Sequence, residues 1–495
     1  MLEYFHQLSA PVQTLIIYSM GSLMICILMF LTKNKLVDSL LFIPFIGLQI
    51  YLNVMEYFEI GITKADGLED YFKIDHLGFI FLTLTTLISI PVIIHSTVYS
   101  FSQHESKKEL EVHNISLLLF IANMSGAIIS CNVGLMWAFL EATTLCASML
   151  IYHERNAEAL EAAWKYVFVC SIGIALTFVG ILFLGMANKS IHELNFSIEG
   201  LKLTVAHMDS IWLKLSFLFI ITGYSVKIGV VPLFTVDIDA KDAAPSPVGA
   251  LLSGGLMNVG ILALLRFYQI FGTTDILGWM NKILIIVGIL SILLAAVYLF
   301  KVANYKRMLA YSSMEHAGIA LIAIASGKIG FVAAILHLIF HAFTKVSLFV
   351  QMGQVYKVFQ GKNMKDIGGY FQLNPLGASV ILLGIFSITA LPPSGLFLSE
   401  FLIFKSLFLS ERYITASILF LLLTIILAAL GTKFFKLLFS PIPNTTISYQ
   451  SINQWESISQ WIMLLTMIYA GIAPPAFLID FISTAVKDFP TYIPL

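Results

Sequence analysis

Apolar residues recur along the whole chain in runs of roughly 20, the length that an α-helix needs to cross the hydrocarbon core of a bilayer. The runs predict about fourteen transmembrane helices, and no linker between them is long enough for a separate soluble domain. This pattern is typical of an all-α polytopic membrane protein. The predicted spans are 12–31, 37–54, 76–100, 113–130, 132–152, 162–186, 211–235, 244–268, 278–300, 307–326, 329–352, 376–408, 413–438 and 459–483.

Two of these spans, the seventh and the twelfth, are predicted to be interrupted by prolines. Pro232 interrupts the seventh, and Pro392 and Pro393 interrupt the twelfth. A proline inside a helix removes a backbone hydrogen bond and breaks or kinks the helix. Because a bilayer tolerates free backbone groups only where protein or water satisfies them, both breaks predict buried polar cavities. The breaks lie about 160 residues apart, as two structurally related halves would place them, and such pairs point to a transport site.

The composition and the motifs exclude several classes of function. Hydrophobic residues make up 58% and charged residues 12%, about half the charged share of soluble domains. The net charge of −1, without a basic tail or patch, excludes nucleic acid as a partner. No nucleotide-binding loop or nucleophile motif occurs, and the cysteines lack metal-ligand spacing, so we expect no metal, cofactor or catalytic residue in this chain. The cysteines are Cys26, Cys131, Cys146 and Cys170.

Seven titratable residues fall well inside predicted spans. Each charge at the centre of a bilayer costs ~3 kcal/mol, so each is a functional candidate. Three of them are spaced by four residues in the eleventh span and therefore share one helix face, which is the pattern of a proton path. The seven are Glu141, Lys165, Lys227, His337, His341, Lys345 and Glu400.

Proton transfer follows from the coupling of these groups. A buried lysine loses its proton easily, whereas a carboxylate within ~4–6 Å holds the proton on it. We predict that Glu141 pairs with Lys227 and that Glu400 is the partner of Lys345. His337 and His341 would relay protons between them, because the unperturbed pKa of histidine lies near neutrality.

Each candidate also has a structural interpretation. The predicted pair of Glu141 and Lys227 can be a static tie between helices. Lys165 can bond a carbonyl or extend to the membrane interface, and the histidines can be satisfied core residues. Glu315 and His316, in the tenth span, are accessory candidates. An acidic cluster with Lys241 follows the Pro232 break and is either an entry site for protons or a solvated turn; its acidic members are Asp237, Asp239 and Asp242.

Four stretches of the sequence carry a family resemblance: "KIGVVPLFTVDIDAKDAAPSPVGALLSG", "YKRMLAYSSMEHAG", "HLIFHAFTKVSLFV" and "LPPSGLFLSEF". They resemble the antiporter-like subunits of respiratory complex I, Mrp sodium/proton antiporters and group 4 membrane-bound hydrogenases. The resemblance covers about residues 75–440. A further stretch, "WAFLEATTLCASMLIYHERNAEALEAAWKYVFVCSIGIAL", is most similar to the hydrogenase-4 component F branch.

The resemblance implies two inverted five-helix repeats with broken helices 7 and 12. It divides the chain into N-terminal helices at 1–110, repeats at 111–270 and 271–440, and a C-terminal loop and helix at 441–495. Glu141, Lys227, Glu400 and the eleventh-span set match the family's proton-transfer positions.

The sequence departs from the family pattern in two places. Lys241 stands where many relatives have histidine, and Asn258 where some have lysine. A neutral Asn258 cannot carry a charge, so Ser253 or water would have to bridge the route in the first half.

These features predict a proton-translocating, multi-pass subunit of a respiratory complex in the bacterial inner membrane, with sodium exchange left open. Its partners would be other membrane subunits, membrane lipids and soluble redox subunits, which would carry any NiFe or iron–sulfur centres of an oxidoreductase complex. The alternatives are a subunit of a Mrp-type cation/proton antiporter, a proton channel that energises a soluble partner such as an inorganic-carbon uptake module, and a structural membrane anchor.

Overall fold

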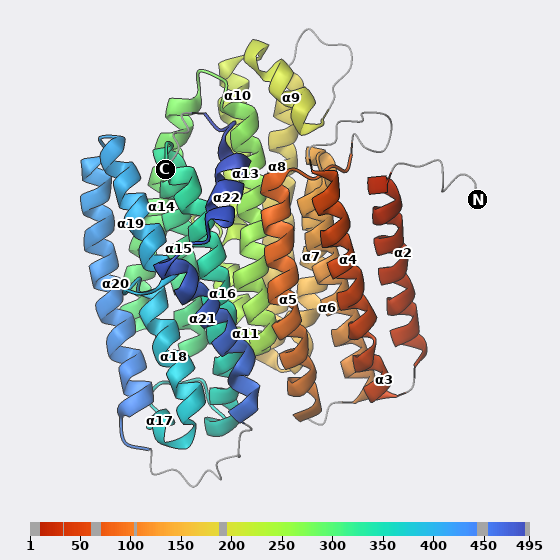
Figure 1. Cartoon of the computed structure of the whole chain (residues 1–495), viewed down its shortest axis with the longest axis vertical. Coiled ribbons are helices and arrows are strands. Elements are labelled where there is room, and N and C mark those ends of the chain that lie inside the picture. The colour runs from red at the N-terminus through yellow and green to blue at the C-terminus, as the bar shows by residue number, and fades with distance from the viewer. Residues whose placement is uncertain are drawn as a thin grey trace. The chain divides into compact units, whose positions relative to one another are not determined.

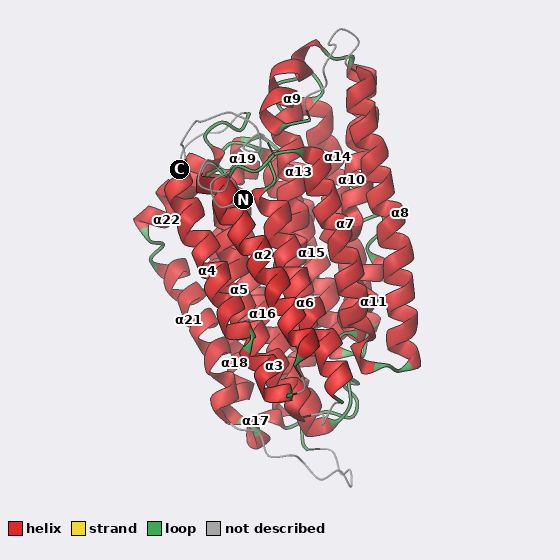
Figure 2. Ribbon diagram, turned by 90° about the vertical axis from the view of Figure 1, so that its right-hand side faces the viewer, coloured by secondary structure: helices red, strands yellow, loops and turns green. Residues whose placement is uncertain are grey.

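The computed structural model describes residues 10–32, 34–60, 71–102, 106–187, 196–442 and 454–490. In these ranges the regular secondary structure is helical, without strands (Figure 2). Twelve of the described helical spans are long and apolar enough to cross a membrane, or thirteen if the bent pair α21 (Ile458–Ile472) and α22 (Ala476–Val486) forms one span. The all-α polytopic class is confirmed, and the count of fourteen stays a prediction.

The chain divides into two compact units. The first comprises Met1–Lys227 and Asn258–Leu277, and the second comprises Ile228–Met257 and Gly278–Leu495. The boundaries expected near residues 110, 270 and 440 stay predictions, and residues 443–453 of the expected C-terminal loop lie outside the described residues.

The first unit is built around α6 (Lys107–Ile129), which packs against helices α2, α3, α5 and α7. Its regular elements appear in Figure 1 in red to yellow-green. They are α2 (Ala10–Leu31), α3 (Lys35–Leu40), α4 (Phe42–Glu59), α5 (His76–Ser102), α6, α7 (Val133–Ile151), η2 (Tyr152–Glu154), α8 (Ala157–Ala187), α9 (Ile198–Thr204), η3 (Val205–His207), α10 (Ser210–Ile228) and α13 (Met257–Phe271).

Polar residues at the helix ends explain where two of these helices begin. Ser106 accepts a hydrogen bond from the backbone N–H of Glu109, and the Glu109 side chain accepts one from the backbone of Ser106, which forms a capping box for α6. The Asn132 side chain accepts from the first N–H groups of α7. These caps set the register of α6 and α7 and therefore the direction in which their polar side chains point.

A network of uncharged polar side chains joins α2, α4, α5 and α6. Tyr18 donates to Gln49 at 2.6 Å, and the Gln49 amide donates to Thr86 at 3.2 Å and to Ser125 at 2.9 Å. Asn53 donates to Thr86 at 2.5 Å. Because every amide hydrogen of Gln49 has an acceptor, this network ties the four helices together.

An ion pair joins the start of α5 to α13 within the first unit. The Arg266 side chain donates to both carboxylate oxygens of Asp75 at 2.5 and 2.6 Å, and the Gly78 N–H donates to the same carboxylate at 2.8 Å. Burial acts to raise the pKa of Asp75, but Arg266 and the hydrogen bonds outweigh it and lower this pKa to about 2. Asp75 therefore stays ionised at neutral pH.

The second unit is built around α16 (Gly330–Phe359), which contacts α12, α15, α18, α19, α21 and α22. Its elements run from green to blue in Figure 1. They are α11 (Thr235–Ala243), α12 (Ser246–Leu251), η4 (Leu252–Leu256), α14 (Leu277–Lys301), α15 (Tyr305–Ser326), α16, α17 (Tyr370–Leu373), α18 (Pro375–Ile388), α19 (Gly395–Leu409), α20 (Tyr413–Phe439), η5 (Gln454–Ser457), α21 and α22.

The structure confirms that both predicted spans are interrupted. Helix α10 ends at Ile228 and α11 begins at Thr235, on either side of Pro232. Helix α18 ends at Ile388 and α19 begins at Gly395, on either side of the two adjacent prolines. In α19 the first free N–H groups are capped by Ser394, whose hydroxyl accepts from Phe397.

Candidate functional site

Lys227 is the buried cation of the first unit. It lies in the last turn of α10, and its Nζ donates to the hydroxyl oxygens of Thr143 at 3.1 Å and Thr144 at 2.7 Å, both on α7. The same Nζ lies 5.5 Å from the centre of the Tyr166 ring on α8. Neutral oxygens and an aromatic face therefore hold this ammonium group.

The pairing of Glu141 with Lys227 stays a prediction, and in the structure the two side chains share Thr144 as a hydrogen-bond partner. Glu141 accepts hydrogen bonds from Ser171 of α8 at 2.7 Å and from Thr144 at 3.3 Å. Thr144 therefore bridges the two charged groups, since its oxygen accepts from the ammonium and its hydrogen is donated to the carboxylate. The reason is local: Thr144 follows Glu141 by three residues, on the same face of α7.

Lys165 is exposed, as its structural interpretation allows, and its accessory role stays a prediction. Lys165 lies in the third turn of α8 with half of its side chain exposed, and its Nζ lies 2.6 Å from the carboxylate of Glu161, one turn earlier. An exposed pair at this spacing is an ordinary feature of a helix surface.

Lys345 is the buried cation of the second unit. Its Nζ donates to the hydroxyl oxygen of Ser312 at 2.6 Å and to the carbonyl oxygen of Leu309 at 2.7 Å, both on α15. The role of Glu400 as the partner of Lys345, with histidines relaying protons between them, stays a prediction. As in the first unit, neutral oxygens of a neighbouring helix hold the ammonium group.

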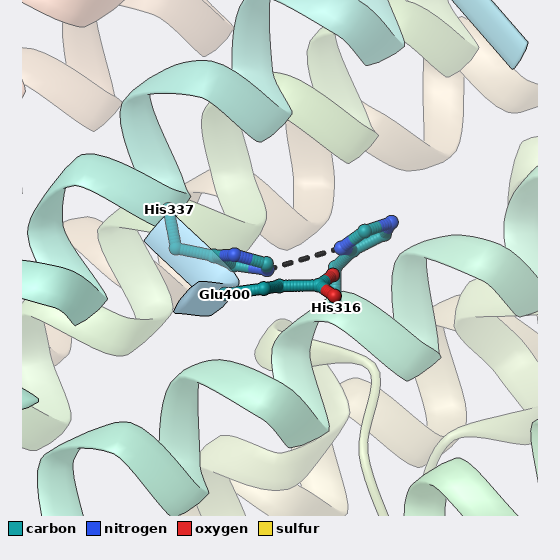
Figure 3. A group of neighbouring side chains, drawn as sticks. All are labelled: His316, His337 and Glu400. Atoms are coloured by element: carbon teal, nitrogen blue, oxygen red, sulfur yellow. Dashed lines mark hydrogen bonds between the residues drawn. The ribbon is translucent and has the colours of Figure 1, made fainter. Parts of the chain in front are cut away.

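Histidines from α15 and α16 form a hydrogen-bonded group in the second unit. His316 Nδ1 lies 3.0 Å from His337 Nε2, and His337 Nδ1 lies 3.0 Å from the Ser399 hydroxyl of α19. His316 Nε2 lies 3.1 Å from the carbonyl oxygen of Ile388. Figure 3 shows the rings of His316 and His337 facing each other, with the carboxylate of Glu400 beside them. The prediction of a histidine relay thus acquires a specific geometry.

The same group is the one place among the described residues where three metal-ligating side chains converge. Donor atoms of His316, His337 and Glu400 all lie within 4.8 Å of one another. The facing nitrogens of the two histidines are already engaged with each other, which is the arrangement of a proton relay. The expectation that this chain holds no metal of its own stays a prediction.

His341 and Glu315 complete this region and carry unsatisfied atoms. Both ring nitrogens of His341 and the Oε2 atom of Glu315 are buried, and they have no hydrogen-bond partner among the described residues. The ring of His341 lies 5.0 Å from that of His316. Buried polar groups are normally paired, so these atoms are exceptions that a proton-transfer role would explain.

Three of the four residues in the cluster after the Pro232 break are buried and they lie on helix α11, so its interpretation as a solvated turn is wrong. Lys241 is fully buried and lies 2.6 Å from the carboxylate of Asp237, one turn earlier on α11. Asp242 accepts from the side chain of Asn304 at 2.7 Å, and Arg307 contacts both Asp239 and Asp242. These contacts tie α11 to the start of α15.

Ser253, predicted as a bridging group, lies in a π-helical turn at Leu252–Leu256. Its hydroxyl lies 2.6 Å from that of Ser313 on α15, and both side chains are fully buried. A π-turn inside a helix displaces one residue toward a neighbour and is frequent at functional sites. The contact places a hydroxyl pair beside the polar face of α15.

Sequence reasoning missed the hydroxyl groups that bind the charged residues. The missed residues share a simple signal, because each is close in sequence to a titratable residue inside a predicted span. They are Thr143, Thr144, Ser171, Ser312 and Ser399.

Comparison with known proteins identifies the family. Residues 130–428 match the family model described as NADH:quinone oxidoreductase/Mrp antiporter, TM. The chain belongs to this family. Its membership confirms the expectation of an antiporter-like, proton-translocating, multi-pass membrane subunit.

One relative and two solved structures illustrate the likeness. The chain is 32% identical over 382 residues to a hydrogenase-4 component F homolog of Methylacidiphilum infernorum, covering 76% of this chain and 79% of the relative. Its fold matches a chain of the Mrp complex from Dietzia with a TM-score of 0.82 at 14% identity, covering 97% of this chain and 98% of that one. A chain of the archaeal membrane-bound sulfane sulfur reductase matches with a TM-score of 0.81 at 18% identity and the same coverage.

Proposed function

We propose that this antiporter-family chain moves protons through two buried lysine sites, one in each unit, and that it carries no redox chemistry of its own. The observation that carries the proposal is the bridge in the first unit. Lys227, Thr144 and Glu141 form an unbroken chain of hydrogen bonds between a buried ammonium and a carboxylate. A hydroxyl in that position passes a proton without moving its own oxygen.

The proton step in the first unit conserves every atom. A proton leaves Lys227 Nζ for the oxygen of Thr144 while the hydroxyl proton of Thr144 passes to Oε2 of Glu141. The products are a neutral lysine, an intact threonine and a protonated glutamic acid. Two opposite charges disappear together, so the step leaves no net charge in a low-dielectric environment, where an unpaired charge is costly.

In the second unit Lys345 plays the corresponding part. It lies on the face of α16 that also carries His337 and His341, and it is held by Ser312 and a backbone carbonyl. Glu400 serves the histidine pair, to which its carboxylate lies close, and not the lysine. Protons in this unit therefore pass between Lys345 and Glu400 through imidazole groups, which both donate and accept.

We infer that the chain works beside other membrane subunits in a complex of the bacterial inner membrane. Soluble partner subunits would carry any NiFe or iron–sulfur centres, and lipids would cover its outer faces. The name of the hydrogenase-4 component F relative supports this setting. Purification of the native complex and mass spectrometry of its companion chains tests it, and the absence of any redox subunit would contradict it.

Lysine replacement tests proton movement. Lys227→Met and Lys345→Met each remove a buried ammonium, and we expect either variant to abolish proton uptake by inside-out vesicles that contain the assembled complex. Lys165→Met is the matched control, because it removes an exposed lysine that pairs with Glu161 on the same helix. Normal uptake by both buried-lysine variants, in amounts of complex equal to the wild type, would refute the proposal.

A further inference from the structure

The two prolines between α18 and α19 leave one carbonyl group without a backbone donor. In a continuous helix the carbonyl of Ile388 would accept from the N–H of the residue four positions later, which is Pro392 and has none. The residue after it, Pro393, has none either, and the N–H of Leu391 donates to Phe386. Among the described residues the partner of the Ile388 carbonyl is the imidazole of His316, at 3.1 Å.

This contact determines which nitrogen of His316 carries a proton. A carbonyl oxygen can only accept, so His316 Nε2 must be the protonated donor. In a neutral ring Nδ1 is then unprotonated and accepts, at 3.0 Å, from His337 Nε2. A neutral His337 that donates from Nε2 has an unprotonated Nδ1, which accepts from the Ser399 hydroxyl at 3.0 Å. The three hydrogen bonds that join Ser399, His337, His316 and Ile388 are therefore all donated in the same direction, from Ser399 toward Ile388. These three hydrogen bonds are called the series below.

The Ser399 hydroxyl has a second acceptor, which permits the opposite arrangement. It lies 2.9 Å from the carbonyl oxygen of Leu396, one turn earlier in α19. When the hydroxyl turns to that carbonyl, its oxygen can accept from a protonated Nδ1 of His337. His337 Nε2 then accepts from His316 Nδ1, and His316 holds two protons as an imidazolium, still bound to Ile388.

We propose that Ser399 is a relay residue that switches this series between its neutral and its once-protonated arrangement. The proposal rests on the proton-moving function proposed above. A proton from Glu400 reaches the oxygen of Ser399 as the hydroxyl proton passes to His337 Nδ1, and the proton on His337 Nε2 moves to His316 Nδ1. Glu400 ends as a carboxylate, His316 as an imidazolium, and Ser399 and His337 keep their original proton counts.

The surroundings of the series match both ends of this step. An oxygen of the Glu400 carboxylate lies within 4.8 Å of one ring nitrogen of each histidine, and Glu400 follows Ser399 directly in α19. On the other side the ring of His341, with two unpartnered nitrogens among the described residues, lies 5.0 Å from His316 and is the next acceptor toward Lys345. The helix break thus keeps His316 Nε2 as a donor to the Ile388 carbonyl. Rotation of the Ser399 hydroxyl allows the other hydrogen bonds of the series to reverse their direction.

The protonation states can be measured without measuring transport. We expect the ¹⁵N magnetic-resonance signals of the full chain, labelled at histidine, to show at mildly alkaline pH a protonated Nε2 and an unprotonated Nδ1 in both His316 and His337. Assignment comes from the loss of each signal in His316→Gln and His337→Gln. A neutral His316 protonated at Nδ1 would overturn the proposal, because the Ile388 carbonyl would then lack its donor.

Three serine variants test the relay in the assembled complex. Ser399→Ala removes the hydroxyl and lowers proton uptake at least about tenfold, the usual effect of losing one positioned proton-transfer group, whereas Ser399→Thr retains the hydroxyl and keeps uptake within about twofold. Ser406→Ala is the matched control, since Ser406 is equally buried in α19 but bonds Ser326 and the Gly327 carbonyl. Equal uptake by the two alanine variants would overturn the proposal. A wild type without uptake would instead refute the proposed function, while the histidine signals would still decide the relay.

Discussion

The two neighbouring threonines of α7 give the sharpest prediction about the first unit. Thr143 and Thr144 are both fully buried, and both accept a hydrogen bond from Lys227. They differ in what their own hydroxyl groups donate to: Thr144 donates to Glu141, whereas Thr143 donates to the carbonyl of Leu140. Replacing each by valine removes one hydroxyl and keeps the shape of the side chain.

The expected magnitudes follow from this difference. A hydrogen bond to a charged group is worth about 1.5–3 kcal/mol, so each variant loses a similar amount of stability. In Thr144→Val the same free energy is also lost from the stabilisation of the transition state for proton transfer between Lys227 and Glu141. Proton uptake therefore slows about 10- to 160-fold. In Thr143→Val the bridge between Lys227 and Glu141 is intact, and we expect uptake within about threefold of the wild type.

The assay is dye-monitored proton uptake by inside-out vesicles that contain the assembled complex, normalised to the amount of this chain. Thermal unfolding of the purified variants checks that both lose comparable stability. Equal slowing of uptake in the two variants would refute the reasoning, because a difference between them is what the bridge requires. Undiminished uptake in Thr144→Val would show that Glu141 and Lys227 exchange protons without that hydroxyl.

Two further predictions concern stability. The pKa of Asp75 is lowered to about 2, so its pair with Arg266 stabilises the fold fully above about pH 4 and loses its contribution as pH falls toward 2. Because 46% of the Asp75 side chain is exposed, we expect Asp75→Asn to cost only about 1 kcal/mol at neutral pH in denaturant unfolding; an equal loss at pH 2 would contradict this origin. A Cβ added at Gly223 would lie 2.4 Å from the carbonyl oxygen of Gly173, so Gly223→Ala destabilises by about 1–3 kcal/mol or more in thermal unfolding. Gly431→Ala, where the added atom meets nothing within 4 Å, is the control and is expected to be neutral or stabilising.

The positions of the broken helices could be predicted from the sequence because the physical effect of proline is local. Pro232 and the Pro392–Pro393 pair each lack the backbone N–H that a continuous helix needs, although Pro91 lacks it too and lies inside the continuous helix α5. The count of spans was harder to predict. The apolar run at 376–408 consists of two shorter helices on either side of the break, and hydropathy averages over such a break.

The charged residues of the candidate site were found from the sequence, but their partners were not. Glu141, Lys227 and Lys345 stand out because a titratable residue is rare in an apolar run. The attraction between opposite charges suggested which residues pair. The structure shows that hydroxyl or carbonyl oxygens accept the hydrogen bonds of both lysine ammonium groups. Lys165 stands out in the same way, yet it lies on the exposed face of α8.

The sequence by itself determined the class of the protein, the location of the breaks and the set of titratable residues inside the spans. These features depend on the free energy of transferring an apolar segment from water into the bilayer and on the missing N–H of proline. Both are properties of the local chain. Only the tertiary structure decided which atoms bind Lys227 and Lys345, and that His316 meets the carbonyl of Ile388. Such contacts depend on distances of about 3 Å between separate helices, and hydropathy contains no information about how one helix is rotated against another.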